Sequence, residues 1–321
     1  MCRMITLADI RDAQTRIAGR LHRTPISSSS TLAHRAGVAR FELKCESFQK
    51  TGSFKVRGVL NRLTQLDDDA RARGVVTVSA GNHAQALAWG AKAAGLRCTV
   101  VMPENASRTK VDASKGYGAT VILHGNSMDA FQKARDLAQT EGFTFIHPFD
   151  HDGTIAGTGT VSLEILEQTD VPDVVVIPVG GGGLISGMAI GLKESNPAIR
   201  VIGVEPTGAA VMRQSLDAGR ALRMDAPTSI ADGLAAPMAG ERNFDAVQRY
   251  VDDVVLVSDD EIVEAMQLLL SRCKLLAEGA GAAATAALIT GKIPVKGTEH
   301  VVAMLSGGNV DLARLGNLLS S

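Results

Sequence analysis

The stretch Val174-Val175-Val176-Ile177-Pro178-Val179-Gly180-Gly181-Gly182-Gly183-Leu184 joins a short apolar run, four glycines and the start of a helical pattern. Such a continuous apolar run is typical of a parallel strand that helices cover on both faces. Glycines after the strand let backbone N–H groups converge on an anion, and the helix N-terminus adds partial positive charge. The stretch therefore predicts a strand, a phosphate-binding loop and a helix. The alternatives are a dinucleotide site or a plain tight turn, although neither the G-x-G-x-x-G register nor a Walker pattern is present.

Six further apolar runs alternate with helical or turn-rich segments, at residues 74–78, 98–102, 119–123, 143–146, 201–204 and 301–305. Repeated alternation of strands and helices predicts a doubly wound α/β fold with mostly parallel sheets. Turn formers at 147–150 and a charged stretch at 66–72 indicate two crossings between domains. We therefore expect a small domain at 73–147, inserted into a large domain made of 1–72 and 148–321.

The 33 basic and 34 acidic residues nearly cancel, so charge gives no argument for nucleic acid or an anionic membrane as a partner. Four scattered cysteines, Cys2, Cys45, Cys98 and Cys273, have neither the CxxC spacing of a zinc site nor the pattern of a disulfide framework. The N-terminus lacks the apolar stretch of a signal peptide, and no segment approaches the ~18 apolar residues of a membrane span. These features predict a cytoplasmic protein.

Lys55 lies in Ser53-Phe54-Lys55-Val56-Arg57-Gly58, between two apolar residues. Burying an ammonium costs several kcal/mol unless it is paired or neutralised. A lysine held in a cleft loses its proton more easily and becomes a nucleophile that forms imines. The alternative is an ordinary lysine whose head reaches water from a helix start.

Two other polar motifs follow predicted strands. Ser79-Ala80-Gly81-Asn82-His83 could hold a carboxylate through consecutive N–H groups, or it could be a capped helix start. Ser306 ends the last run, where its hydroxyl could face a ring nitrogen or merely begin a turn. A fourth group, His147, Asp150, His151 and Asp152, matches no strong metal signature, and we interpret it as a polar loop between domains.

Together these motifs resemble those of fold-type II pyridoxal-phosphate enzymes, which have a two-domain, tryptophan synthase beta-like fold. Within them the chain resembles the serine/threonine dehydratase and serine racemase group, from His22-Arg23-Thr24-Pro25 to Ser306-Gly307-Gly308-Asn309-Val310. Cysteine synthases are set aside because Phe54 precedes the lysine and His83 follows Asn82.

The resemblance implies a role for each motif. Lys55 would carry the cofactor covalently and act as the base on the alpha proton, and the cofactor phosphate would protonate the leaving hydroxyl. The expected cofactor-binding residues are Phe54, Lys55, Asn82 (to the phenolic oxygen), Gly180, Gly181, Gly182, Gly183, Leu184, Glu278 and Ser306 (to the pyridine nitrogen). The turn of Ser79, Ala80, Gly81, Asn82 and His83 would bind the substrate carboxylate.

Three departures from the group refine the expectation. Ala80 stands where racemases carry a serine that works on the face opposite the lysine, which favours dehydration. Glu205 matches a ligand of the divalent-cation site of racemase-like members, but Val211 stands where an acid is usual, so that ion is in doubt. The chain ends soon after Ser306, so we expect no C-terminal regulatory domain of the isoleucine-inhibited type.

The resemblance thus implies a dehydratase that converts a beta-hydroxy amino acid, L-threonine or L-serine, to a 2-oxo acid and ammonia. The alternatives are a serine racemase and a dehydratase for 3-hydroxyaspartate or phenylserine. A nicotinamide-dependent oxidoreductase would leave Lys55 unexplained, and a non-catalytic sensor of a phosphate ligand is the remaining class. A homodimer or homotetramer is expected from the resemblance and from the general frequency of dimers.

Overall fold

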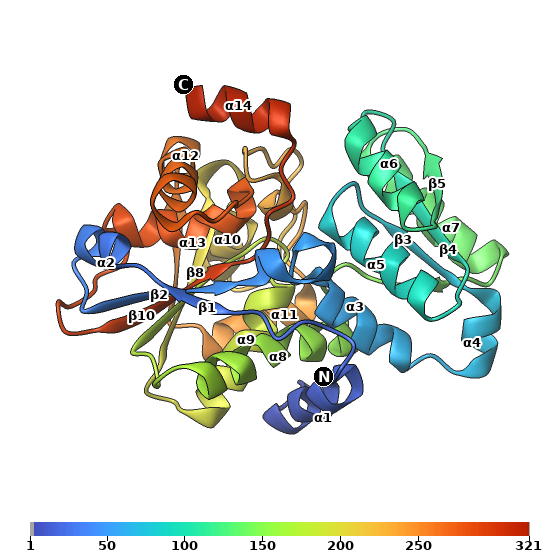
Figure 1. The fold of residues 1–321 in the computed structure, drawn as a ribbon. Helices are drawn as coiled ribbons and strands as arrows, with labels where there is room; N and C mark the ends of the chain where they lie inside the picture. Colours follow the sequence, from blue (N-terminus) through green and yellow to red (C-terminus); the bar gives the residue numbers. More distant parts are fainter. Residues whose placement is uncertain (1–2, 321) are drawn as a thin grey trace.

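The computed structural model describes residues 3–320 and contains two sheets, each covered by helices (Figure 1). The six-stranded sheet has the order β1-β2-β10-β7-β8-β9, and the four-stranded sheet has the order β5-β4-β3-β6. Every pairing is parallel except that of β1 with β2. This is the predicted α/β class with mostly parallel sheets, which the structure confirms.

The strands of the large sheet come from both ends of the chain: β1 (Ile26–Ser28), β2 (Arg40–Cys45), β7 (Val174–Pro178), β8 (Arg200–Pro206), β9 (Asp253–Val257) and β10 (His300–Leu305). Those of the small sheet are consecutive: β3 (Val75–Val78), β4 (Cys98–Met102), β5 (Thr120–Leu123) and β6 (Thr144–Phe145). The small sheet therefore falls within 73–147, while the exact division of the chain into two domains stays a prediction.

Fourteen α-helices are seen within residues 3–320. They are α1 (Leu7–Ile17), α2 (Ser30–Ala36), α3 (Lys55–Thr64), α4 (Asp68–Arg73), α5 (Asn82–Ala93), α6 (Arg108–Gly116), α7 (Ser127–Thr140), α8 (Asp152–Gln168), α9 (Gly183–Ser195), α10 (Val211–Ala218), α11 (Glu241–Tyr250), α12 (Asp259–Leu268), α13 (Gly279–Ile289) and α14 (Leu312–Ser320). Short 3₁₀ turns lie at Glu46–Phe48, Lys50–Gly52, Thr207–Ala209 and Asp232–Leu234, and a π-helical turn lies at Leu269–Cys273. None of these helices is long and apolar enough to span a membrane.

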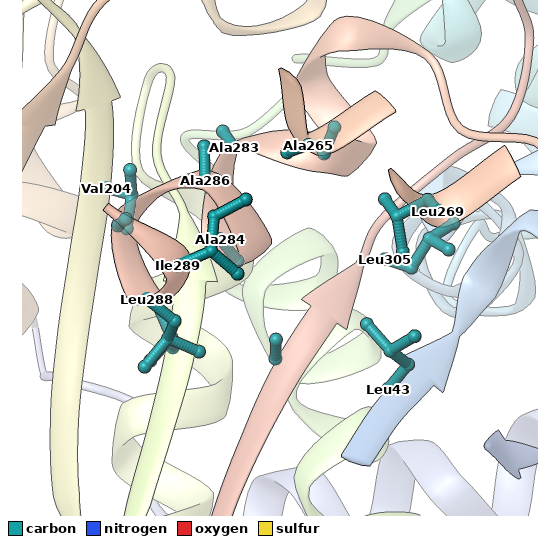
Figure 2. Packing of buried hydrophobic residues seen from close by; sticks show 14 of the residues in the cluster. Leu43, Val204, Ala265, Leu269, Ala283, Ala284, Ala286, Leu288, Ile289 and Leu305 are labelled. Atoms are coloured by element: carbon teal, nitrogen blue, oxygen red, sulfur yellow. The ribbon is translucent and has the colours of Figure 1, made fainter. Parts of the chain in front are cut away.

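Helix α13 shows how small residues pack the large sheet. All eleven of its residues are buried, and most are alanine or glycine, so the helix lies close to the strands (Figure 2). Leu43 of β2, Val204 of β8 and Leu305 of β10 share this cluster with the helix. The opposite face of the sheet packs on α9, through residues such as Ile185 and Met188.

All seven strands expected from the sequence are present, with ends that differ by at most two residues. Three further strands, β1, β2 and β9, were not predicted. Strand β2 was missed because Glu42 and Lys44 interrupt its apolar run. Both side chains are nevertheless buried, since Glu42 pairs with Arg40 and His300, and Lys44 pairs with Glu164.

A buried ionic network anchors the helix that begins at Lys55. Arg57 is 1% exposed and lies between two carboxylates, with bonds of 2.7 and 2.8 Å to Glu46 and of 2.7 and 2.9 Å to Glu164. Lys44 and Thr24 complete the network, since Lys44 Nζ donates to Glu164 and Thr24 Oγ1 donates to Glu46. The network thereby ties α3 to β2 and α8.

Removing one charge from this network should strongly destabilise the protein. We expect Glu46→Gln to lower the free energy of unfolding by about 3 kcal/mol, because Arg57 would stay buried without its full counter-charge. Urea unfolding followed by circular dichroism measures this change. Glu167→Gln is the matched control, because Glu167 pairs with Arg23 at the surface, where a loss of at most about 1 kcal/mol is expected. Equal losses of unfolding free energy in the two variants would contradict the claim that the buried pair of Glu46 and Arg57 matters more for stability than a surface pair.

Candidate active site

A cavity of about 580 Å³ lies between the two sheets, and nearly every site residue predicted from the sequence lines it. These residues are Phe54, Lys55, the turn from Ser79 to His83, Gly180 to Gly183, Leu184, Glu278 and Ser306. The turn from Ser79, the glycine run and Ser306 follow the carboxyl ends of β3, β7 and β10, where open α/β sheets bind ligands. Glu205 is the predicted site residue that does not line the cavity.

Lys55 is the first residue of α3 and extends its amine into the cavity. Its Nζ lies 3.3 Å from the carbonyl oxygen of Pro148 and 5.0 Å from the centre of the Phe54 ring. No carboxylate among residues 3–320 forms an ion pair with it within 4.0 Å. Removal from bulk water lowers its pKa to about 8, while the charge of Glu278 acts in the opposite direction. A substantial fraction of the amine is therefore neutral near physiological pH.

The backbone before Lys55 is held by the end of β10. Phe54 N–H donates to the carbonyl of Ser306 at 3.1 Å, and Ser53 forms an antiparallel bridge with Gly307. Gly307 has no room for a side chain, because a Cβ there would lie 2.3 Å from Oε1 of Glu278. The lysine motif and the Ser306 motif, far apart in the chain, are thus direct neighbours.

The glycine run forms a tight loop at the N-terminus of α9. A Cβ on Gly181 or Gly183 would lie 2.5 or 2.8 Å from Phe149, and Gly182 has a φ of +97° that side chains rarely adopt. No side chain caps the helix, so the N–H groups of its first turn have no partner within the helix. The positive end of the helix and these free donors form a cradle for an anion.

The turn from Ser79 to His83 leads into α5, with Gly81 as its N-cap. The hydroxyl of Ser79 accepts a hydrogen bond from Gly81 N–H at 3.1 Å, and no side chain caps the helix. Nε2 of the His83 ring is directed toward the small sheet, where it lies 3.1 Å from Thr77 Oγ1 and 3.3 Å from the carbonyl of Ile146. Burial lowers its pKa to about 3, so the ring is neutral. The turn can therefore offer backbone N–H groups rather than the imidazole.

Glu278 and Asn82 form a bridge across the cavity floor. Asn82 Nδ2 donates to Glu278 Oε1 at 2.6 Å, and Asn309 donates to Asn82 Oδ1 at 2.9 Å. Burial raises the pKa of Glu278 to about 7, and the bond from Asn82 opposes the shift. Ser306 also lies here, 3% exposed, and its hydroxyl donates to the carbonyl of Ala280 at 3.3 Å.

These features fit pyridoxal phosphate: a buried amine with a lowered pKa, an uncapped glycine cradle of positive potential, and a neutral hydroxyl in one cavity. In agreement, the profile of the family described as pyridoxal-phosphate dependent enzyme matches residues 17–307. The chain belongs to this family. Its cofactor is pyridoxal phosphate.

Curated relatives are similar over nearly the whole chain. An L-threonine ammonia-lyase of Thermotoga maritima is 43% identical over 99% of this chain and 79% of that protein. The catabolic L-threonine dehydratase TdcB of Staphylococcus aureus strain N315 is 42% identical over 98% of this chain and 92% of that protein. These similarities confirm the resemblance to the dehydratase and racemase group.

Solved structures are similar as well. Maize serine racemase has a TM-score of 0.93 and is 39% identical, covering 99% of this chain and 98% of that chain. A threonine deaminase of T.th. has a TM-score of 0.90 and is 40% identical, covering 96% of this chain and 99% of that chain. Proteins named for both activities therefore share this fold.

The polar loop after β6 uses the rings of its two histidines as hydrogen-bond acceptors for the backbone. His147 Nδ1 accepts from the N–H groups of Phe149 and Asp150, and His151 Nδ1 accepts from Gly153. Burial lowers the pKa of each ring to about 4. No group of three His, Cys, Asp or Glu residues suitable for a metal occurs in the described part of the chain.

Two residues that support the glycine cradle were missed from the sequence. Phe149 packs directly on Gly181 and Gly183, and Asn243 Nδ2 donates to the Gly181 carbonyl at 2.9 Å. Phe149 belongs to the loop of turn formers, and Asn243 follows the cradle by about 60 residues. Neither has a local sequence signal, because only the fold brings it to the cradle.

The reactivity of the Lys55 amine should rise with pH through about 8, as its ammonium loses a proton. In Glu278→Gln the inflection should move to lower pH, because the negative charge that favours the ammonium is gone. Pulsed reductive methylation of the cofactor-free protein, followed by peptide mass spectrometry, measures this. Asp232→Asn, another acidic residue of the cavity wall, should leave the inflection unchanged. An inflection near 10 in the unsubstituted protein would contradict the burial of this amine.

Proposed function

We propose that this protein is a pyridoxal-phosphate-dependent dehydratase, an ammonia-lyase that converts L-threonine and L-serine to the corresponding 2-oxo acid and ammonia. The observation that carries the proposal is the Lys55 amine, which shares one cavity with an anion cradle and with the turn from Ser79 to His83. The threonine ammonia-lyase and dehydratases that resemble the whole chain support the reaction type.

The predicted site residues that line the cavity each have a place in this reaction. We assign the phosphate to Gly180–Gly183 and the covalent link to Lys55, with Phe54 and Leu184 against the cofactor. Bound pyridoxal phosphate withdraws electrons and so makes the alpha proton of the amino acid acidic. The Lys55 amine accepts that proton at Nζ, since its lowered pKa leaves it partly neutral.

The turn from Ser79 to His83 orients the substrate. Its N–H groups at the start of α5 bind the alpha carboxylate, which sets the direction of the bond to the alpha proton. Asn82 belongs to this turn and is held by Glu278 and Asn309, and it would donate to the phenolic oxygen of the cofactor. Ser306 offers the ring nitrogen a neutral hydroxyl, which stabilises a protonated ring less than a carboxylate would. A weaker electron sink favours loss of a beta group over reactions that need a long-lived carbanion.

Serine racemase is the second candidate, because the maize enzyme has nearly the same fold. Racemisation needs a proton donor on the face opposite Lys55, and the methyl group of Ala80 has no proton to exchange. We therefore assign the protein to dehydration. We also propose a cytoplasmic location, because the four scattered cysteines show no disulfide framework. The family resemblance and the general frequency of dimers lead us to propose a homodimer or homotetramer.

Turnover should yield ammonia and a 2-oxo acid from L-threonine and L-serine, and Lys55→Ala should abolish it. A panel of L-threonine, L-serine, 3-hydroxyaspartate and phenylserine, assayed by coupled reduction of the 2-oxo acid, identifies the preferred side chain. Chiral chromatography of the same reactions detects D-amino acids. Formation of D-serine without pyruvate would reverse the proposal in favour of a racemase.

Ala80→Ser should raise the ratio of racemisation to elimination, because it places an exchangeable proton opposite Lys55. The expected change is an increase of roughly tenfold or more, typical of one positioned acid or base. The ratio of D-serine to pyruvate from L-serine measures it, and Ala80→Gly controls for altered packing. An unchanged ratio in Ala80→Ser would show that Ala80 does not decide the outcome.

A further inference from the structure

Glu205 is a buried carboxylate that lies outside the cavity and has no role in the reaction described above. It lies on β8 with an exposed fraction of 0%, directly before the segment that leads to α10. Its two oxygens each accept a backbone hydrogen bond at 2.8 Å, Oε1 from Met212 and Oε2 from Arg213. Both donors belong to the first turn of α10, so Glu205 satisfies N–H groups that the helix itself cannot.

This arrangement does not fit a divalent cation. Each Glu205 oxygen already faces an N–H donor, and the positive end of a helix repels a cation. Val211, a neighbour in this turn, supplies no oxygen from its side chain, whereas Mg²⁺ and Ca²⁺ require six or more oxygen ligands. The described residues 3–320 contain no cluster of three acidic, histidine or cysteine side chains for such an ion.

Helix α10, whose first turn is capped by Glu205, contacts the glycine cradle through Met212. A Cβ on Gly182 would lie 2.7 Å from the terminal methyl of Met212 and 2.7 Å from Cβ of Asn243, so both side chains contact the loop. The backbone N–H of the same Met212 is the donor to Glu205 Oε1. One residue therefore connects the buried carboxylate to the loop that we assign to the cofactor phosphate.

We propose that Glu205 is a positioning residue for the phosphate cradle, and that it acts through α10 and Met212 without a divalent cation. The inference rests on the proposed role of Gly180–Gly183. The carboxylate orients the first turn of α10, and Met212 then holds Gly182 in its left-handed conformation. The cradle N–H groups are thereby aligned before the cofactor arrives, which reduces the cost of ordering them on binding.

The test compares pyridoxal phosphate with pyridoxal, which lacks the phosphate. Full-length holoprotein is brought to equilibrium by dialysis against a series of concentrations of each compound. We expect Glu205→Gln to weaken binding of pyridoxal phosphate roughly tenfold, because an amide N–H would face a backbone N–H. Affinity for pyridoxal should stay unchanged, because Lys55 and the ring contacts are intact. An equal loss for both compounds would overturn the proposal.

Two further variants keep the test decisive. Asp67→Asn makes the same carboxylate-to-amide change at the cap of α4, where Asp67 accepts from Ala70 N–H at 2.7 Å, and should not alter either affinity. Met212→Ala leaves the Glu205 cap in place and removes the contact with Gly182, so it should also weaken pyridoxal phosphate selectively. Unchanged affinity in a folded Glu205→Gln and in Met212→Ala would overturn the proposal. A wild-type protein that binds both compounds equally would instead refute the cradle assignment itself.

The claim that Glu205 acts without a divalent cation is tested separately, by thermal unfolding of the holoprotein. Addition of millimolar Mg²⁺ or Ca²⁺, or of EDTA, should change the Tm by less than about 1 °C, because both Glu205 oxygens are bonded to backbone N–H groups and do not couple these ions to the folded state. A cation-dependent rise in Tm that is present in the wild type and absent in Glu205→Gln would show that Glu205 is a cation ligand, contrary to the proposal.

Discussion

The burial of the Lys55 amine, without a carboxylate in direct contact, is the constraint around which the site is arranged. Its nearest polar partner is the carbonyl of Pro148, which cannot neutralise a charge. The free energy cost of burying the ammonium appears as a pKa lowered to about 8. Glu278 is near enough to moderate this shift, but its carboxylate is bonded to Asn82 instead. The amine is therefore available as a nucleophile and as a base.

Such an amine needs a rigid support, and the neighbouring Arg57 provides it. Arg57 is two residues from Lys55 and is bonded to Glu46 and Glu164 on different elements. The backbone on the other side of the lysine is held by the end of β10, through Ser306 and Gly307. The paired guanidinium of Arg57 thus fixes the position of Lys55, whose amine has a backbone carbonyl rather than a carboxylate as its partner. Buried pairs are weak arguments for stability, but they do specify geometry.

Much of this site could be predicted because several of its parts are local in sequence. An apolar run followed by glycines predicted the strand β7 and the loop at the start of α9, and the structure contains both. Binding of a phosphate by that loop stays a proposal. Lys55 and Ser306 were also recognisable, because each belongs to a motif of adjacent residues. Strand β2 was not predicted, because Glu42 and Lys44 look like surface residues in the sequence. Their ion-pair partners, which allow them to be buried, are seen only in the structure.

The parts that escaped prediction depend on contacts between distant segments. The bond between Asn82 and Glu278 joins residues 196 positions apart, and no spacing rule relates them. Phe149 and Met212 support the glycine loop through packing and Asn243 through a hydrogen bond, and no local sequence pattern marks any of the three. Glu205 was singled out as a match to a cation ligand of related enzymes, but its hydrogen bonds to the start of α10 became visible only in the fold.

The central claim is that Lys55 is the residue that carries pyridoxal phosphate. The most direct measurement is reduction of the holoprotein with borohydride, followed by proteolysis and mass spectrometry of the peptides. The account predicts loss of the visible absorbance band and a single phosphopyridoxyl adduct on the peptide that contains Lys55. An adduct on another lysine, or an unmodified Lys55 peptide in cofactor-loaded protein, would contradict it.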